Sequence, residues 1–288
     1  DYLEAADLFD RDYAYFSSYS TSWLAHAKKY VEMITEKLSL GGGSKVVEIA
    51  SNDGYLLQYF KEKNIPALGI EPTACTAKAA RKIGIETLEE FFGTEMAKKL
   101  AGQNIKADLV IGNNVLAHVP DINDFVKGMK IILKKRGTIT MEFPHLLQLI
   151  ENSQFDTIYH EHFSYLSFMT VSRIFEKQGL ELFQVEEIST HGGSLRIYAK
   201  HQEDKSRNIG PSVEKLLKKE LSQGMNKLAY YGGFQKKADA IKYALVEFLI
   251  ASKRRGKSAA AYGAAAKGNT LLNYCGIKKD LVRFAVDR

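Results

Sequence analysis

The stretch "IYHEHFSYLS" (residues 158–167) gathers side chains that can move protons. Tyr159, Glu161 and His162 stand within four positions, with His160 among them, in a chain that has seven histidines. Histidine is the side chain whose ordinary pKa lies near neutrality, so it suits a general base. The two histidines could share one face of an extended segment and bind a metal, but ligand sets need three or four groups and Glu161 would point away. A third interpretation is a ring-rich stretch packed at a domain edge with satisfied hydrogen bonds.

Strand and helix patterns alternate along the part of the chain that precedes this stretch. Short apolar runs predict buried strands, and helical patterns separate them. The predicted strands cover residues 45–50, 67–71, 107–113 and 137–143. Beyond the stretch, residues 180–188 and 194–201 read as antiparallel strands joined by the glycine-containing turn "STHGG". We expect a parallel sheet with helices on both faces that finishes in an antiparallel strand, a pattern more common in methyltransferases than in dehydrogenases.

The two ends of the chain read differently from this central part. Near the N-terminus an aromatic segment precedes a helix with apolar residues at helical spacing, capped by Ser20 or Thr21. After the polar linker at 203–212, residues 211–255 read as charged helices interrupted at "YYGGF", followed by a strand, a helix and a strand. The predicted fold class is α/β: a Rossmann-like domain at 41–203, a smaller C-terminal Rossmann-like α/β domain with a helical linker at 204–288, and an N-terminal segment at 1–40 that covers the active site.

The bulk composition narrows the class of protein. The net charge is +6, but basic and acidic residues are mixed along the chain, which favours a solvated surface, or a face that attracts a diphosphate, over nucleic-acid binding. The two cysteines, Cys75 and Cys275, form neither a disulfide framework nor a metal-ligand pattern, so we expect a reducing, cytoplasmic setting. No apolar run approaches the ~20 residues that would span a membrane. Because the chain begins without Met and ends in a strand pattern, we expect both ends to be cut.

The loop "VVEIASNDG" (46–54) is the predicted cofactor site, because ligands of open α/β sheets bind at the carboxyl ends of the strands. A diphosphate needs several glycines, whereas this loop offers two acids and suits a cation. Glu71 follows the second strand, eighteen residues after Asp53, where an acid binds ribose hydroxyls. A cation joined to a nucleoside describes S-adenosylmethionine. The alternative is that these acids only end strands and cap helices. The candidate cofactor-binding residues are Glu48, Ala50, Asn52, Asp53, Gly54, Glu71, Asn113 and Asn114.

Seven segments resemble, in this order, the sugar C-methyltransferases, which methylate carbon 3 of nucleotide-linked 4-keto-deoxysugars. The segments are "YAYFSSYSTSWLAHA", "VVEIASNDGYLL", "GIEPT", "NNVLAHVPDINDF", "FDTIYHEHFSYLS", "THGGSLRIY" and "YGAAAKGNTLLN". The resemblance covers nearly the whole chain, and its Y-H-E-H and G-A-A-A-K-G-N-T segments are specific. Such proteins usually begin with a cysteine-rich zinc-binding region, which this chain does not show, so no zinc is assigned to its residues.

The resemblance implies catalytic roles for six residues. His162 would remove the proton from the carbon beside the ketone, Glu161 would orient or polarise groups around it, and Tyr159 would hold the sugar or the enolate. His118 would stabilise the enolate. Tyr13 or Tyr15 would close over the site, with Tyr19 a weaker third, and the sequence does not separate them.

The turn "AAYGAAAKGNTLL" (260–272) is the predicted substrate-nucleotide site, because small residues, a helix N-terminus and a lysine suit a diphosphate. The alternative is a tightly packed turn with a surface lysine. The candidate substrate-binding residues are Tyr262, Gly263, Lys267, Asn269 and, in the hairpin turn, His191. Rival functions are an O- or N-methyltransferase, a nicotinamide-dependent oxidoreductase of sugar nucleotides, and a non-catalytic ligand-binding protein. The sequence predicts no oligomeric state.

Overall fold

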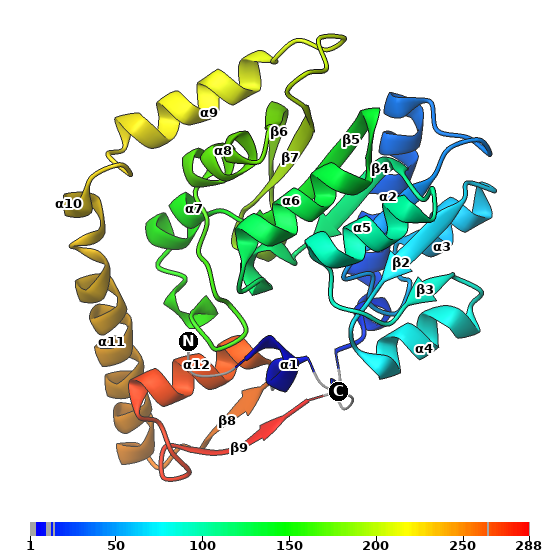
Figure 1. Cartoon of the computed structure of the whole chain (residues 1–288). Helices are drawn as coiled ribbons and strands as arrows, with labels where there is room; N and C mark the ends of the chain where they lie inside the picture. Colours follow the sequence, from blue (N-terminus) through cyan, green and yellow to red (C-terminus); the bar gives the residue numbers. More distant parts are fainter. Residues whose placement is uncertain (1–3, 10–12, 14, 264, 288) are drawn as a thin grey trace.

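A seven-stranded sheet forms the centre of the computed structural model, which describes residues 4–9, 13, 15–263 and 265–287. The strand order is β3-β2-β1-β4-β5-β7-β6, and β7 alone runs antiparallel to its neighbours (Figure 1). The strands are β1 Val46–Ile49, β2 Ala67–Ile70, β3 Thr87–Leu88, β4 Ala107–Asn113, β5 Leu133–Pro144, β6 Leu180–Ile188 and β7 Ser194–His201. The predicted parallel sheet with an antiparallel strand is therefore confirmed.

Helices cover both faces of this sheet, as Figure 1 shows. One face packs against α5, α6, α8 and α9, and the other against α2, α3 and α4. Successive strand residues serve opposite faces: Val46 belongs to the second cluster and Val47 to the first. The helices are α1 Ala5–Leu8, α2 Thr21–Leu38, α3 Leu57–Glu62, α4 Ala74–Lys82, α5 Thr94–Gly102, α6 Ile122–Ile132, α7 Leu146–Glu151, α8 Phe168–Lys177 and α9 Pro211–Ser222.

Helix α2 forms where the apolar spacing and the cap predicted it. The Ser20 side chain accepts a hydrogen bond from the backbone N–H of Trp23, which settles the choice between Ser20 and Thr21. Ala27, Val31 and Ile34 are buried against the sheet. Burial of this apolar stripe, rather than helix propensity, fixes α2 beside the strands.

Two strands differ from the sequence-based prediction. β3 was missed, because it has two residues and no apolar run. β5 begins at Leu133 rather than at Gly137: Leu133 pairs with Ala107, and the register then shifts so that Thr138 pairs with Leu109. The residues of the intervening bulge are polar, so the first part of the strand has no apolar run that would predict it.

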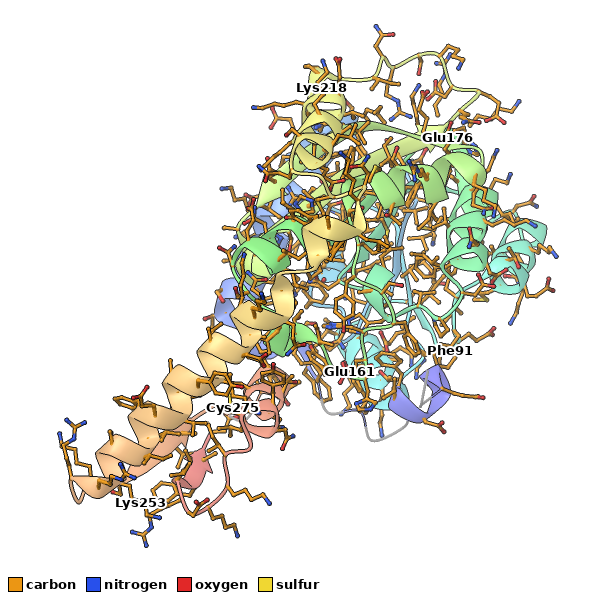
Figure 2. All side chains as sticks on the ribbon, turned by 90° about the vertical axis from the view of Figure 1, so that its left-hand side faces the viewer. Phe91, Glu161, Glu176, Lys218, Lys253 and Cys275 are labelled. Carbon is orange, nitrogen blue, oxygen red and sulfur yellow. The ribbon has the colours of Figure 1, made fainter. Side chains whose placement is uncertain are left out.

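The C-terminal part is a smaller unit at the bottom of Figure 1. It follows α10 Leu228–Tyr231 and the long helix α11 Phe234–Arg254, and consists of β8 Ala259–Tyr262, α12 Ala266–Cys275 and β9 Val282–Val286. The strands β8 and β9 pair in parallel, so the predicted strand–helix–strand unit is present. Figure 2 shows α11 extending away from the main sheet to this unit. Among the helices described, none is long and apolar enough to cross a membrane.

Candidate active site

The loop after β1 has an uncommon backbone conformation. Ala50 and Asn52 have φ values of 56° and 49°, in the left-handed region, which costs an ordinary L-residue roughly 1–2 kcal/mol. β2 passes so close that a Cβ added at Gly69 would lie 2.4 Å from the Ser51 Oγ. Packing therefore holds the loop in a shape that its residues do not prefer, as is common at ligand sites.

Buried polar atoms without hydrogen-bond partners cluster at the carboxyl ends of β1 and β4. Among the residues that the structure describes, they include both carboxylate oxygens of Glu48, the Oδ1 of Asp53, both side-chain polar atoms of Asn113, the Oδ1 of Asn114 and the Oγ of Ser51. Buried polar groups are normally paired. The cluster therefore indicates a polar ligand that bonds to these strand ends.

The charge of this cluster indicates which kind of ligand fits. Burial, aided by the nearby charges of Glu71 and Asp53, raises the pKa of Glu48 well above its usual range, although the Tyr55 hydroxyl acts in the opposite direction. A positive group beside Glu48 would favour its carboxylate form. The ammonium and sulfonium groups of S-adenosylmethionine are such groups, so these residues fit that cofactor.

Glu71 has more protein partners than the sequence suggests. One carboxylate oxygen accepts from the Asn52 N–H at 2.8 Å, and the other accepts from the N–H and the hydroxyl of Thr73, the N–H at 3.0 Å. A carboxylate has about four acceptor positions. Glu71 thus shapes the cofactor loop and keeps capacity for ribose hydroxyls.

The N-terminal strap, residues 15–18, lies against the cofactor loop. The N–H of Ser17 donates to the Asn52 Oδ1 at 2.9 Å, and the N–H of Ser18 donates to the Asp53 Oδ2 at 3.1 Å. The Asn52 side-chain amide in turn donates to the carbonyl of Tyr15 at 3.0 Å. The strap therefore joins the predicted cofactor loop to the segment that carries the candidate tyrosines.

His162 is oriented by a backbone group. Its Nδ1 lies 2.7 Å from the Thr157 carbonyl oxygen, which can only accept, so Nδ1 carries the proton and Nε2 is left as a proton acceptor. Burial lowers the pKa of His162, the Thr157 carbonyl opposes this, and the charge of Lys267 lowers it further. A neutral imidazole with a free Nε2 is the form that a general base requires. Thr157 was missed by the sequence analysis, because a carbonyl has no residue signature.

His118 faces His162 across the site. The two ring centroids are 4.7 Å apart. Burial, together with the neighbouring His162, lowers the pKa of His118 to about 3, although the Glu161 backbone raises it, so this ring is neutral. The Ala117 carbonyl accepts from the N–H groups of Phe163 and Ser164, which fixes residues 152–167, named here the catalytic loop for their predicted role, beside η2 (Leu116–His118).

Tyrosines complete this group of rings. Tyr159 lies 4.3 Å from His162 between ring centroids, and burial with the charge of Glu161 raises its pKa to about 12. Burial and the charges of Glu161 and Glu71 also raise the pKa of Tyr13. Tyr15 instead has its pKa raised by burial and by Asp53. The ring of Phe9 packs against Tyr13 and lies 5.8 Å from the His118 ring between centroids. The Tyr15 carbonyl instead bonds to Asn52 of the cofactor loop, so the two tyrosines have different neighbours, although Tyr15 also acts on Tyr159.

The other candidates divide between the site and the surface. Burial raises the pKa of Glu161, and the Thr157 carbonyl is the group that orients the His162 ring. His160, beside it, is exposed. Tyr19 is 81% exposed. Gly54, with φ at 78°, packs against α4 and its following turn.

The predicted substrate residues are only partly brought to the catalytic loop. Burial lowers the pKa of both His162 and His191, and the charge of Lys267, at the start of α12, lowers both further. The Nε2 of His191 accepts from the Asn114 side-chain amide at 3.0 Å. Tyr262 is 76% exposed, and Asn269 is exposed too. Gly263 bonds through its N–H to Val286, so it closes the small sheet.

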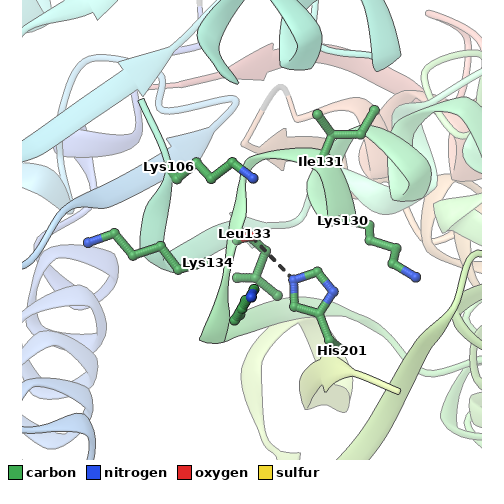
Figure 3. Close-up of a pocket in the computed structure, with 7 residues that line it drawn as sticks. Lys106, Lys130, Ile131, Leu133, Lys134 and His201 are labelled. Atoms are coloured by element: carbon green, nitrogen blue, oxygen red, sulfur yellow. Dashed lines mark hydrogen bonds between the residues drawn. The ribbon is translucent and has the colours of Figure 1, made fainter. Parts of the chain in front are cut away.

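A basic hollow of about 650 Å³ lies at the opposite end of the sheet. Figure 3 shows lysines and His201 around the start of β5, with the His201 ring bonded to the Leu133 carbonyl. Lys130 and Lys134 pair there with Glu203 and Asp108. Because its residues lie far along the strands from the polar cluster, this hollow is separate from the candidate site. Within the described part of the chain, no three metal-ligating side chains are grouped to hold an ion.

The strand order, the antiparallel β7 and the unpaired carboxylate oxygens of Glu48 and Asp53 define a Rossmann-like S-adenosylmethionine-dependent methyltransferase. Residues 23–185 match a family described as methyltransferase domain, and residues 189–288 match C-methyltransferase C-terminal domain. The chain is 33% identical over 281 residues to C-methyltransferase NovU of Streptomyces niveus, covering 98% of this chain and 67% of that protein. The chain therefore belongs to the C-methyltransferases, and the predicted enzyme class is confirmed.

A solved structure agrees on the fold. The PH0226 protein of Pyrococcus horikoshii OT3 superimposes with a TM-score of 0.54 at 15% identity, over 65% of this chain and 94% of that one. The matched share corresponds in size to the large sheet with its helices. The resemblance supports the architecture alone.

Proposed function

We propose that the enzyme methylates the carbon beside the ketone of a nucleoside-diphosphate-linked keto-deoxysugar, with His162 as the base. The observation that carries this proposal is the hydrogen bond from the His162 Nδ1 to the Thr157 carbonyl, which leaves Nε2 as the acceptor. Alkylation at carbon needs such a base, because a C–H group must first lose its proton. A ketone beside that carbon makes the proton acidic enough for a side chain to remove.

The surrounding residues supply the remaining requirements of that step. S-adenosylmethionine, when bound, supplies an electrophilic methyl group on a sulfonium. The Tyr159 hydroxyl, whose raised pKa keeps it protonated, is a donor for the developing enolate oxygen, and the neutral ring of His118 lies beside the base. The N-terminal strap, together with Tyr13, covers the reacting groups and limits the access of water.

Charge at the start of α12 supports a diphosphate substrate. Lys267 acts on His162 and His191, so its positive charge is directed at the same site. A lysine at a helix N-terminus attracts phosphate oxygens. In this proposal residues 41–203 hold the methyl donor, residues 204–288 hold the nucleotide end, and residues 1–40 close the site.

The test is a methyl-transfer assay with labelled S-adenosylmethionine and nucleoside-diphosphate 4-keto-deoxysugars in deuterated water. We expect the label on the carbon beside the ketone, and solvent deuterium at that carbon when the methyl donor is left out. Label on an oxygen or a nitrogen would instead support the alternative O- or N-methyltransferase. Binding of both ligands without turnover would support a non-catalytic protein.

Replacing Lys267 by Met should weaken substrate binding and shift the pH dependence. We expect the KM for the sugar nucleotide to rise by about tenfold, which corresponds to about 1.4 kcal/mol. The positive charge of Lys267 lowers the pKa of His162, so its removal raises that pKa. Since the base acts when deprotonated, activity lost as pH falls should be lost at a higher pH in Lys267→Met. Lys278→Met is the control. An unmoved acid limb contradicts the placement of Lys267.

Replacing Tyr13 and Tyr15 separately by Phe should give different defects. The Glu161 and Tyr159 charges act on Tyr13, so Tyr13→Phe should lower kcat by about 10-fold, which is about 1.4 kcal/mol and within the range of one lost hydrogen bond. The Tyr15 side chain is 55% exposed and lies toward Asp53, so Tyr15→Phe should change kcat by less than about threefold. Steady-state kinetics decide between them, and equal defects would contradict the separation.

A further inference from the structure

Glu220 is a fully buried carboxylate outside the site described above, yet it bonds to the segment that carries His162. It lies on α9 and is 0% exposed. One of its oxygens accepts from the Nε2 of His145 at 2.7 Å and from the N–H of Phe168 at 2.6 Å. The other accepts from the N–H of Met169 at 2.8 Å. The bonds to Phe168 and Met169 satisfy free donors at the N-terminus of α8, where a negative charge is favoured.

The three groups that donate to Glu220 lie at the two ends of one excursion of the chain: His145 lies where the chain leaves the sheet, and Phe168 and Met169 lie where it returns. His145 follows β5 and forms an isolated bridge with Leu166, and the N–H of Leu146 donates to the Leu166 carbonyl at 3.0 Å. Between these positions the chain forms α7 and then the catalytic loop. Glu220 therefore bonds to the outgoing strand end through His145 and to the returning end through Phe168.

The loop between these ends depends on few backbone bonds to the rest of the sheet unit. Apart from the bonds at the two ends of the loop, the Ala117 carbonyl accepts from the N–H groups of Phe163 and Ser164, beside His162. A shift of the two ends of the loop would therefore move His162 relative to His118, and the rings of these two residues are 4.7 Å apart between centroids. A misplacement of about 1 Å is enough to slow a reaction that depends on aligned groups.

We propose that Glu220 and His145 are positioning residues for the methyl transfer. They hold the two ends of the catalytic loop in place, so that His162 lies beside His118. This inference rests on the proposed role of His162. The same carboxylate also joins the loop to α9, whose chain continues through α11 to α12 and Lys267. The catalytic loop and the segment that leads to Lys267 are thus both attached to the helix that carries this one buried carboxylate.

The experiment compares Glu220→Gln with Glu214→Gln in the intact protein. Glu214 is an exposed residue of the same helix that pairs with Lys218, so it is a matched control. We expect Glu220→Gln to lower kcat by about 10- to 100-fold, as misplacement costs, with the Kd for S-adenosylmethionine within about twofold of the wild type. His145→Gln keeps a donor for Glu220 and should recover most of the kcat that His145→Leu loses.

Amide hydrogen exchange gives a second readout that needs no substrate. Peptides covering 155–165 should exchange faster in Glu220→Gln and in His145→Leu, while peptides of β1 and β4 keep their protection. An unchanged kcat with unchanged loop exchange overturns the proposal, and so does an equal loss of protection throughout the sheet. If Glu220→Gln does not fold, the two His145 variants decide. A His162→Asn enzyme with full activity refutes the proposed function. Amide hydrogen exchange of the loop would still test whether Glu220 and His145 hold it in place.

Discussion

Replacing His162 by Asn is expected to lower kcat by about 10²- to 10⁴-fold, the usual contribution of general acid–base catalysis. Asparagine places an amide N–H near the position of the His162 Nδ1, so the bond to the Thr157 carbonyl can persist and the loop keeps its shape. What is lost is the Nε2 acceptor. Exchange of solvent deuterium into the carbon beside the ketone should therefore disappear, while the Kd for S-adenosylmethionine stays within about twofold.

The control for this prediction is His160→Asn, two positions away in the same loop. His160 is exposed, so its substitution should leave the exchange rate within about threefold. The comparison is made by mass spectrometry of the recovered sugar nucleotide. Exchange that survives in His162→Asn would remove His162 as the base, and methyl transfer without any exchange in the wild type would argue against an enolate.

Local signals were enough to predict the frame of this enzyme. The run at 46–49 is buried on both faces, and the apolar spacing of α2 matches the residues that it buries. Each pattern extends over a few consecutive residues, so it can be recognised in the sequence without knowledge of the fold. Because strand ends of a parallel sheet meet at one edge, the acids Glu48 and Glu71 could be placed together before their contacts were known.

Contacts between distant segments were beyond that reasoning. The Thr157 carbonyl that orients His162 is a backbone group, which every residue has. The separation of Tyr13 from Tyr15 depends on how the strap lies on the cofactor loop, and the bonds of Ser17 and Ser18 to that loop span 35 positions. Glu220 was not singled out, because a single acid in a charged helix resembles a solvated one. These features follow from packing, which the sequence pattern does not encode locally.

Glu48→Gln is expected to weaken S-adenosylmethionine binding without weakening the fold. Burial raises the pKa of Glu48, and the Tyr55 hydroxyl offsets this rise only in part. Such a carboxyl group binds a proton more tightly when folded, so its contribution to stability is lost as pH rises through the folded pKa. Glutamine cannot ionise, so the variant does not lose this stability as pH rises. We therefore expect an unchanged or higher midpoint of thermal unfolding at pH 8 without ligand.

The affinity should change in the opposite direction. A hydrogen bond to a charged group contributes about 1.5–3 kcal/mol, so loss of the carboxylate should raise the Kd for S-adenosylmethionine by roughly 10- to 150-fold. Glu71→Gln is the matched comparison: it disturbs the bonds to Asn52 and Thr73, so both the fold and the affinity should weaken. Calorimetry in two buffers of different ionisation enthalpy should also detect a proton released on binding to the wild type and absent in Glu48→Gln. Tight binding by Glu48→Gln would show that the unpaired acid faces something other than the cation.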